Sequence, residues 1–126
     1  MTSPPKNDAR AHALDTELFQ ELRESLGNEL DVVAGIYGRF MNNAANSIAA
    51  SRGQSGAARA STLHTLKGSA AMVGATGIAA LSGHLEESLL ESPVEVAEAA
   101  LRELEGELTR FRAAVATHLR SLGYSK

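Results

Sequence analysis

A histidine, a lysine and a glycine lie close together in the segment 63–70 of this chain. On a helix, His64, Lys67 at i+3 and Gly68 at i+4 are neighbours on one surface. Glycine inside a helix costs about 1 kcal/mol relative to alanine, so its position one turn after a histidine needs a reason. An imidazole beside an ammonium, with no side chain in the way, suits a histidine that accepts a phosphoryl group while a partner protein docks over it.

Phosphoryl transfer to a histidine requires a neutral ring nitrogen, a clear in-line approach and positive charge near the phosphoryl oxygens. An exposed histidine is mostly neutral at pH 7. Lys67 supplies the positive charge, and Gly68 leaves the approach open. The second ring nitrogen of His64 needs a hydrogen-bond partner, because that bond selects the tautomer. Glu86 is the predicted partner, and His84 is a weaker candidate.

Helical periodicity dominates the chain, and no segment alternates like a strand. Asp15 is the predicted N-cap of the first helix and Gly27 its stop. Asn28 is the predicted N-cap of the second helix, which ends before the glycine-containing break at 51–56. Tyr37 on this second helix is either a core residue or a binding residue, and its spacing favours the core.

The histidine lies on the third predicted helix, which begins near Ser55 or Ala57 and ends at Val73. Its buried stripe steps by three or four residues, and this places His64 beside the stripe rather than in it. Thr76 is the predicted N-cap of the fourth helix. Two glycines weaken the helical pattern there, so its boundaries are the least defined by sequence.

The fifth predicted helix has the clearest start signal, because the segment 92–95 combines a serine cap, a proline and a glutamate. Apolar residues then recur in steps of three or four as far as Leu122. This spacing suits antiparallel packing at about 20°. We therefore predict an all-α fold, an antiparallel up-and-down four-helix bundle with an additional N-terminal helix. The bundle is expected over 14–122, after a flexible lead-in or linker at 1–13.

Composition narrows the function classes. The 126 residues are 44% hydrophobic and carry a formal net charge of -3, which supports one packed domain and argues against nucleic-acid binding. The sequence has no cysteine, so disulfides and thiolate sites are excluded. No apolar run approaches the roughly 20 residues of a membrane-spanning helix, and we expect no membrane contact. His12, His84 and His118 lack a metal-binding spacing and are interpreted as ordinary residues.

The segment 64–74 resembles the signature of the histidine-containing phosphotransfer (HPt) family of two-component phosphorelays, which is His-x-x-Lys-Gly followed by small residues and a further glycine. The pair Leu85-Glu86 and the opening segment 14–27 resemble further parts of the family pattern. The resemblance covers roughly residues 14–120. One departure is Leu63, where many relatives have alanine, and we expect this leucine to pack in the core.

The resemblance implies a carrier that moves phosphoryl groups between the aspartates of receiver domains. His64 is then the phospho-acceptor, on Nε2 by the family's usage, and Lys67 stabilises the phosphoryl charge. Gly68 admits the receiver. Apart from the resemblance, Glu86 is either the orienter of the imidazole or, with Glu87, part of a solvated face. The resemblance implies no cofactor in this chain, because the partner receiver supplies the Mg²⁺.

The implied partners are response-regulator receiver domains and a hybrid sensor histidine kinase, in cis or in trans. We expect a monomeric phosphocarrier rather than an enzyme, since the sequence has no glycine-rich nucleotide-binding segment. The expected location is the cytoplasm or the cytoplasmic end of a membrane-bound hybrid kinase. The alternative function is a phosphate-independent docking module that regulates a receiver or partner enzyme. Arg52 and Arg59 either add positive charge on the histidine side or are scattered solubilising charges.

Overall fold

The computed structural model describes residues 13–90 and 94–124. Most of the predicted lead-in at 1–13 and the predicted cap at Ser92 lie outside the described residues. Within the described part the chain is all-helical and has no strand, as predicted. No helix in this part is both long enough and apolar enough to cross a membrane. The helices are α2 (Thr16–Ser25), α3 (Leu30–Arg52), α4 (Gly56–Met72), α5 (Thr76–Ser88) and α6 (Val94–Ser121).

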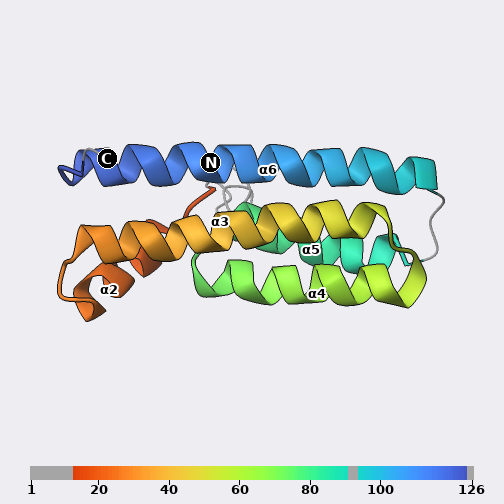
Figure 1. Ribbon diagram of the computed structural model, residues 1–126, viewed down its shortest axis with the longest axis horizontal. Coiled ribbons are helices and arrows are strands. Elements are labelled where there is room, and N and C mark those ends of the chain that lie inside the picture. The colour runs from red at the N-terminus through yellow and green to blue at the C-terminus, as the bar shows by residue number, and fades with distance from the viewer. Residues whose placement is uncertain (1–12, 91–93, 125–126) are drawn as a thin grey trace, which may run out of the picture.

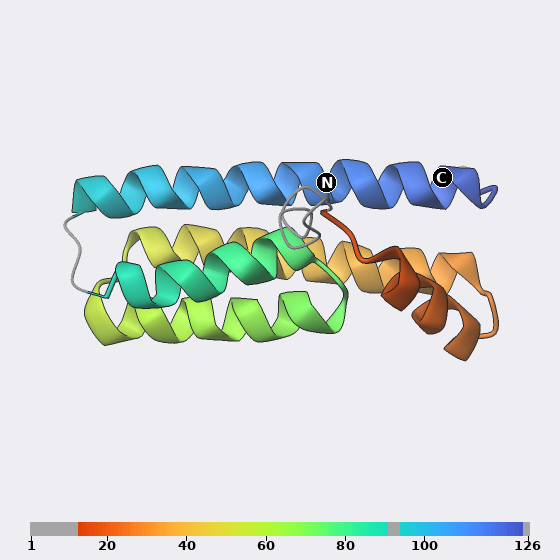
Figure 2. The ribbon, with the colours of Figure 1, turned by 180° about the vertical axis from the view of Figure 1, so that it is seen from behind.

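The two longest helices, α3 and α6, lie side by side along the molecule (Figure 1). The shorter pair α4 and α5 packs against one half of them, and α2 lies against the other half (Figure 2). From α3 to α6, successive helices run in opposite directions. The fold is therefore the predicted up-and-down four-helix bundle, and α2 is the additional N-terminal helix.

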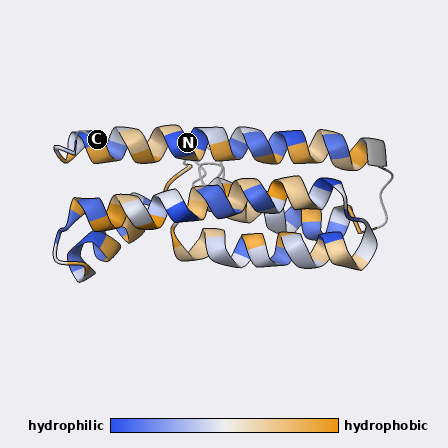
Figure 3. Cartoon of the chain, viewed as in Figure 1, coloured by the Kyte–Doolittle hydropathy of each residue, from blue (hydrophilic) through white to orange (hydrophobic). Residues whose placement is uncertain are grey.

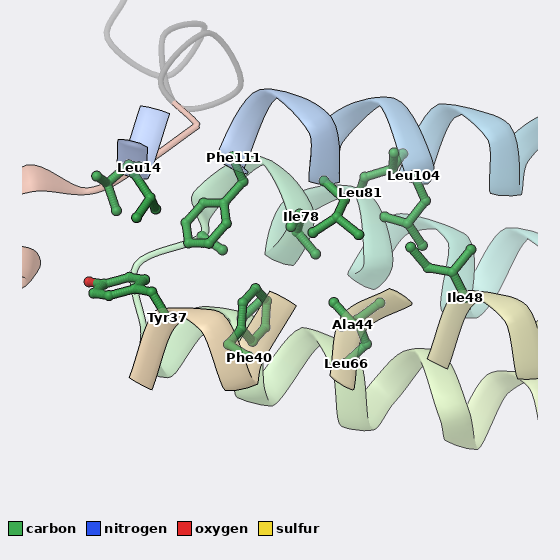
Figure 4. Packing of buried hydrophobic residues seen from close by; sticks show 14 of the residues in the cluster. Leu14, Tyr37, Phe40, Ala44, Ile48, Leu66, Ile78, Leu81, Leu104 and Phe111 are labelled. Atoms are coloured by element: carbon green, nitrogen blue, oxygen red, sulfur yellow. The ribbon is translucent and has the colours of Figure 1, made fainter. Parts of the chain in front are cut away.

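The core forms where the apolar faces of the bundle helices meet. Hydrophobic and hydrophilic stretches alternate along the helices, as expected for helices with one buried face (Figure 3). Side chains from all four bundle helices point into the shared interior, among them Phe40, Leu66, Ile78 and Leu104 (Figure 4). Full burial of one such side chain stabilises a fold by about 1.5–3 kcal/mol, so this interior holds α4 and α5 firmly in register.

Tyr37 is a core residue, as its spacing predicted. Its side chain is 0% exposed and stacks on Phe19 of α2 with ring centroids 5.1 Å apart. Phe19 also packs perpendicular to the His118 ring on α6, with centroids 4.6 Å apart. Burial, and secondarily the nearby charge of Asp15, raises the pKa of Tyr37 to about 12. These rings join α2 to both long helices.

Two predicted helix caps were wrong by one residue. Asn28 has a φ of 63°, in the left-handed region, so it belongs to the turn, and Glu29 is the N-cap of α3. Thr76 is the first residue of α5, and the buried Ala75 is its N-cap. In both turns a residue with left-handed backbone lies just before the cap. The spacing of apolar residues does not reveal such a backbone conformation.

Gly74 fixes the turn that follows the histidine helix. Its φ is 75°, and a Cβ at this position would lie 3.0 Å from Cβ of Asp15. The backbone N–H of Asp15 donates to the Gly74 carbonyl at 2.8 Å. Only glycine fits this conformation and this close approach, so the turn ties the end of α4 to the start of α2.

Replacing Asp15 by alanine is expected to lower the free energy of unfolding by about 1 kcal/mol. Its Oδ1 accepts hydrogen bonds from the backbone N–H groups of Glu17 and Leu18, each at 3.1 Å, and so caps α2. Asp15→Asn retains a capping oxygen and should keep most of the stability. Urea denaturation followed by circular dichroism measures both variants, and equal losses in the two would contradict the capping role.

Candidate functional site

His64 lies near the middle of α4, on the side that faces away from the core. Its neighbour Leu63 is 0% exposed, as expected for a core residue, and Leu66 is 2% exposed. Both leucines anchor the helix in the bundle. The His64 side chain is 65% exposed, so the imidazole stands at the rim of the bundle on a rigid element.

Glu86 of α5 contacts the imidazole directly. Its Oε2 lies 3.0 Å from Nδ1 of His64, and its side chain is 23% exposed. An ionised carboxylate can only accept a hydrogen bond, so Nδ1 of the ring carries the hydrogen and donates this bond to Glu86. That bond leaves the lone pair on Nε2. His84 lies on the exposed surface of α5, and Glu86 rather than His84 meets the ring.

Lys67 shares the same carboxylate. Its Nζ lies 3.6 Å from Oε1 of Glu86, and its side chain is 43% exposed. This distance is an ion-pair separation and longer than a hydrogen bond. One glutamate therefore gathers the imidazole and the ammonium at one place, while the ammonium keeps the freedom to turn toward an incoming anion.

Gly68 opens the surface next to the histidine. A Cβ built at this position would meet nothing within 4 Å, so the glycine is not required for the packing of α4 on α5. One turn further along the same ridge, Met72 is 79% exposed. The ridge His64, Gly68 and Met72 follows i+4 spacing and presents an imidazole, a gap and an apolar side chain in sequence.

Two of the three cations considered for the histidine side lie elsewhere. Arg52 forms ion pairs with Glu105 at 2.8 Å and Glu98 at 3.0 Å, both on α6. The hydrogen bonds to Glu105 and Glu98 raise the pKa of Arg52. The first of them also lowers the pKa of Glu105. Arg59 is 3% exposed, and its Nη2 donates to a backbone carbonyl at the end of α5. Of the two interpretations left open by the sequence, neither fits the buried Arg59, and Arg52 pairs with α6 rather than adding charge beside the histidine.

Sequence reasoning missed two features of the site. The first is the exposure of Met72, which its place two turns after His64 on the helix surface could have indicated. The second is a close contact between Lys67 and Gly83 of α5. From the sequence, Gly83 predicts only a weak stretch of helix, although its position three residues before Glu86 puts both residues on one face of α5.

The arrangement has the parts that a phosphoryl acceptor needs. A fixed tautomer exposes one ring nitrogen, a cation lies one turn away, and the surface beside the ring is open. Among the residues that the structure describes, no group of three or more histidine, cysteine or acidic side chains is placed to hold a metal ion.

Comparison with known protein families matches residues 12–114 to the Hpt domain. No match to a curated protein or to a solved structure was found. The matched segment contains His64, Lys67, Gly68 and Glu86. Hpt domains are phosphocarrier domains rather than kinases; they act in phosphorelay signalling and interact with receiver domains. The chain belongs to the Hpt domain family.

Proposed function

We propose that this chain is a phosphorelay intermediate. It accepts a phosphoryl group on Nε2 of His64 from the aspartate of one receiver domain and passes it to another receiver. The observation that carries the proposal is the joint contact of Glu86 with His64 and Lys67, beside the open position of Gly68. An incidental surface histidine would need none of these partners.

The transfer step follows from the tautomer. The lone pair on Nε2 of His64 attacks phosphorus, the bond from phosphorus to the receiver's aspartate oxygen breaks, and the aspartate leaves as a carboxylate. No proton has to leave Nε2, because the ring proton is on Nδ1. The ring becomes positively charged, and the carboxylate of Glu86, 3.0 Å from Nδ1, stabilises this charge. The same chemistry in reverse passes the phosphoryl group from His64 to the aspartate of a second receiver.

Lys67 acts on the phosphoryl oxygens. Its ammonium lies within reach of Glu86 without a short hydrogen bond to it, so it can turn to the transferring group and neutralise part of its charge. The receiver brings the Mg²⁺ and the acidic pocket in this proposal, and this chain contributes no cofactor of its own.

The docking surface for the receiver is the exposed side of α4. Around His64 the side chains are small or absent, and Met72 supplies one exposed apolar contact. Such a shallow surface allows the rim of a receiver's active site to approach the imidazole. We place the chain, as a monomer, in the cytoplasm with its receivers and a hybrid sensor kinase in cis or in trans.

Transfer of label from a phosphorylated receiver tests this function. A receiver domain carrying radioactive phosphate on its aspartate, incubated with this chain and Mg²⁺, should label the chain within minutes. The label should be lost in acid and retained in alkali, as a phosphoramidate is. A chain that stays unlabelled by every receiver of its own cell, or one that carries an acid-stable label, would contradict the proposal.

A phosphate-independent docking module is the second candidate, because the open surface at Gly68 and Met72 would serve docking alone. Calorimetric titration of a receiver with the wild type and with His64→Ala separates the two functions. Unchanged binding together with unchanged signalling output in the variant would favour docking. The shared contact of Glu86 with His64 and Lys67 favours the relay, since docking needs neither contact.

A further inference from the structure

Gly83 occupies an unusual place in α5. It lies inside the helix, where glycine costs about 1 kcal/mol relative to alanine, and its backbone is not left-handed. A Cβ built at Gly83 would lie 2.9 Å from Cδ and 3.9 Å from Cγ of Lys67. The aliphatic part of the lysine therefore lies against α5 in the space that the missing side chain leaves.

The gap directs the lysine toward the reacting group. Gly83 and Glu86 are three residues apart and share the face of α5 that meets α4. The stem of Lys67 passes over Gly83, and its ammonium ends 3.6 Å from Glu86, which holds Nδ1 of His64 at 3.0 Å. The Lys67 side chain thus starts on α4, passes over Gly83 and ends at the carboxylate that also contacts the imidazole.

Four other helical glycines differ in this respect. At Gly35, Gly38, Gly68 and Gly106 a Cβ would meet nothing within 4 Å. At Gly83 the obstacle is the flexible stem of one side chain rather than backbone, so an added methyl group would displace the lysine and leave the helices in place. Glycine at position 83 therefore costs helix propensity but leaves room for the Lys67 side chain.

We propose that Gly83 is a positioning residue for phosphotransfer: its missing side chain admits the stem of Lys67 and thereby keeps the ammonium next to His64. This inference rests on the proposed relay function and adds a residue to it. Gly83 touches neither the receiver nor the phosphoryl group in this account and acts only through Lys67.

A double-mutant cycle tests the proposal with wild type, Lys67→Ala, Gly83→Ala and the double variant. The rate of His64 labelling is measured with a phosphorylated receiver and, separately, with phosphoramidate as a small donor. Loss of a charge-assisted hydrogen bond at a half-exposed site predicts a decrease of about tenfold for Lys67→Ala. Gly83→Ala should show a similar decrease with both donors. The double variant should match Lys67→Ala within about twofold, because the glycine has no effect once the ammonium is gone.

Gly106→Ala on α6 is the matched control and should label at the wild-type rate. Labelling of Gly83→Ala at the wild-type rate would overturn the proposal, and so would a further tenfold decrease in the double variant relative to Lys67→Ala. Urea denaturation should show Gly83→Ala at least as stable as wild type. A loss of stability would show that the glycine serves helix packing instead, and this too would overturn the proposal. Failure of the relay function itself gives a different result, an unlabelled wild type.

Discussion

His64→Gln is expected to abolish labelling of the chain by a phosphorylated receiver. The glutamine amide has no ring nitrogen with a free lone pair, so it cannot form the bond to phosphorus. The loss of labelling should exceed that of every other single substitution considered. The other site residues only orient the ring, stabilise the phosphoryl charge or leave room for the receiver. Labelling is measured with radioactive phosphate after rapid mixing with the receiver and Mg²⁺.

The fold should not respond to this substitution. The His64 side chain is 65% exposed, and its hydrogen bond to Glu86 lies at the rim of the bundle. Surface changes of this kind alter stability by about 0.5 kcal/mol or less. His84→Gln, on the exposed surface of α5, is the matched control and should label normally. Labelling of His64→Gln at the wild-type rate would refute the relay.

The bundle could be predicted from sequence because the information for it is local. Apolar residues at steps of three or four define each buried face, and these steps placed Tyr37 and Leu63 correctly in the core. Helix starts were less certain. A cap depends on the backbone of one residue, and at Asn28 a left-handed conformation moved the cap to Glu29.

The site was predictable where it lies on one helix. His64, Lys67 and Gly68 share a turn of α4, so their proximity follows from helix geometry alone. The contact of Glu86 with the ring depends on the register of α5 against α4, which periodicity leaves open by one turn. Arg52 and Arg59 show the same limit, since long side chains choose their partners from three-dimensional neighbours that the sequence does not name.

Gly68→Gln is expected to slow transfer from a receiver by about 100-fold while the fold becomes slightly more stable. Glutamine is the better helix former by about 0.5 kcal/mol, and the added Cβ would meet no neighbouring helix or side chain within 4 Å. The new side chain projects into the surface over which the receiver must approach. Overfilling a close interface costs about 1–3 kcal/mol, and the upper end corresponds to roughly 100-fold.

The size of the donor separates the role of Gly68 from that of Lys67. Phosphoramidate needs no protein surface, so it should label His64 in Gly68→Gln at nearly the wild-type rate, whereas loss of the Lys67 ammonium slows both donors. Gly35→Gln on the exposed side of α3 is the control for the glutamine itself. If Gly68→Gln accepted phosphate from the receiver as fast as wild type, the partner would have to approach the imidazole from another side. If both donors were slowed equally, the glutamine would be acting on the imidazole, and the open position would have no role in docking.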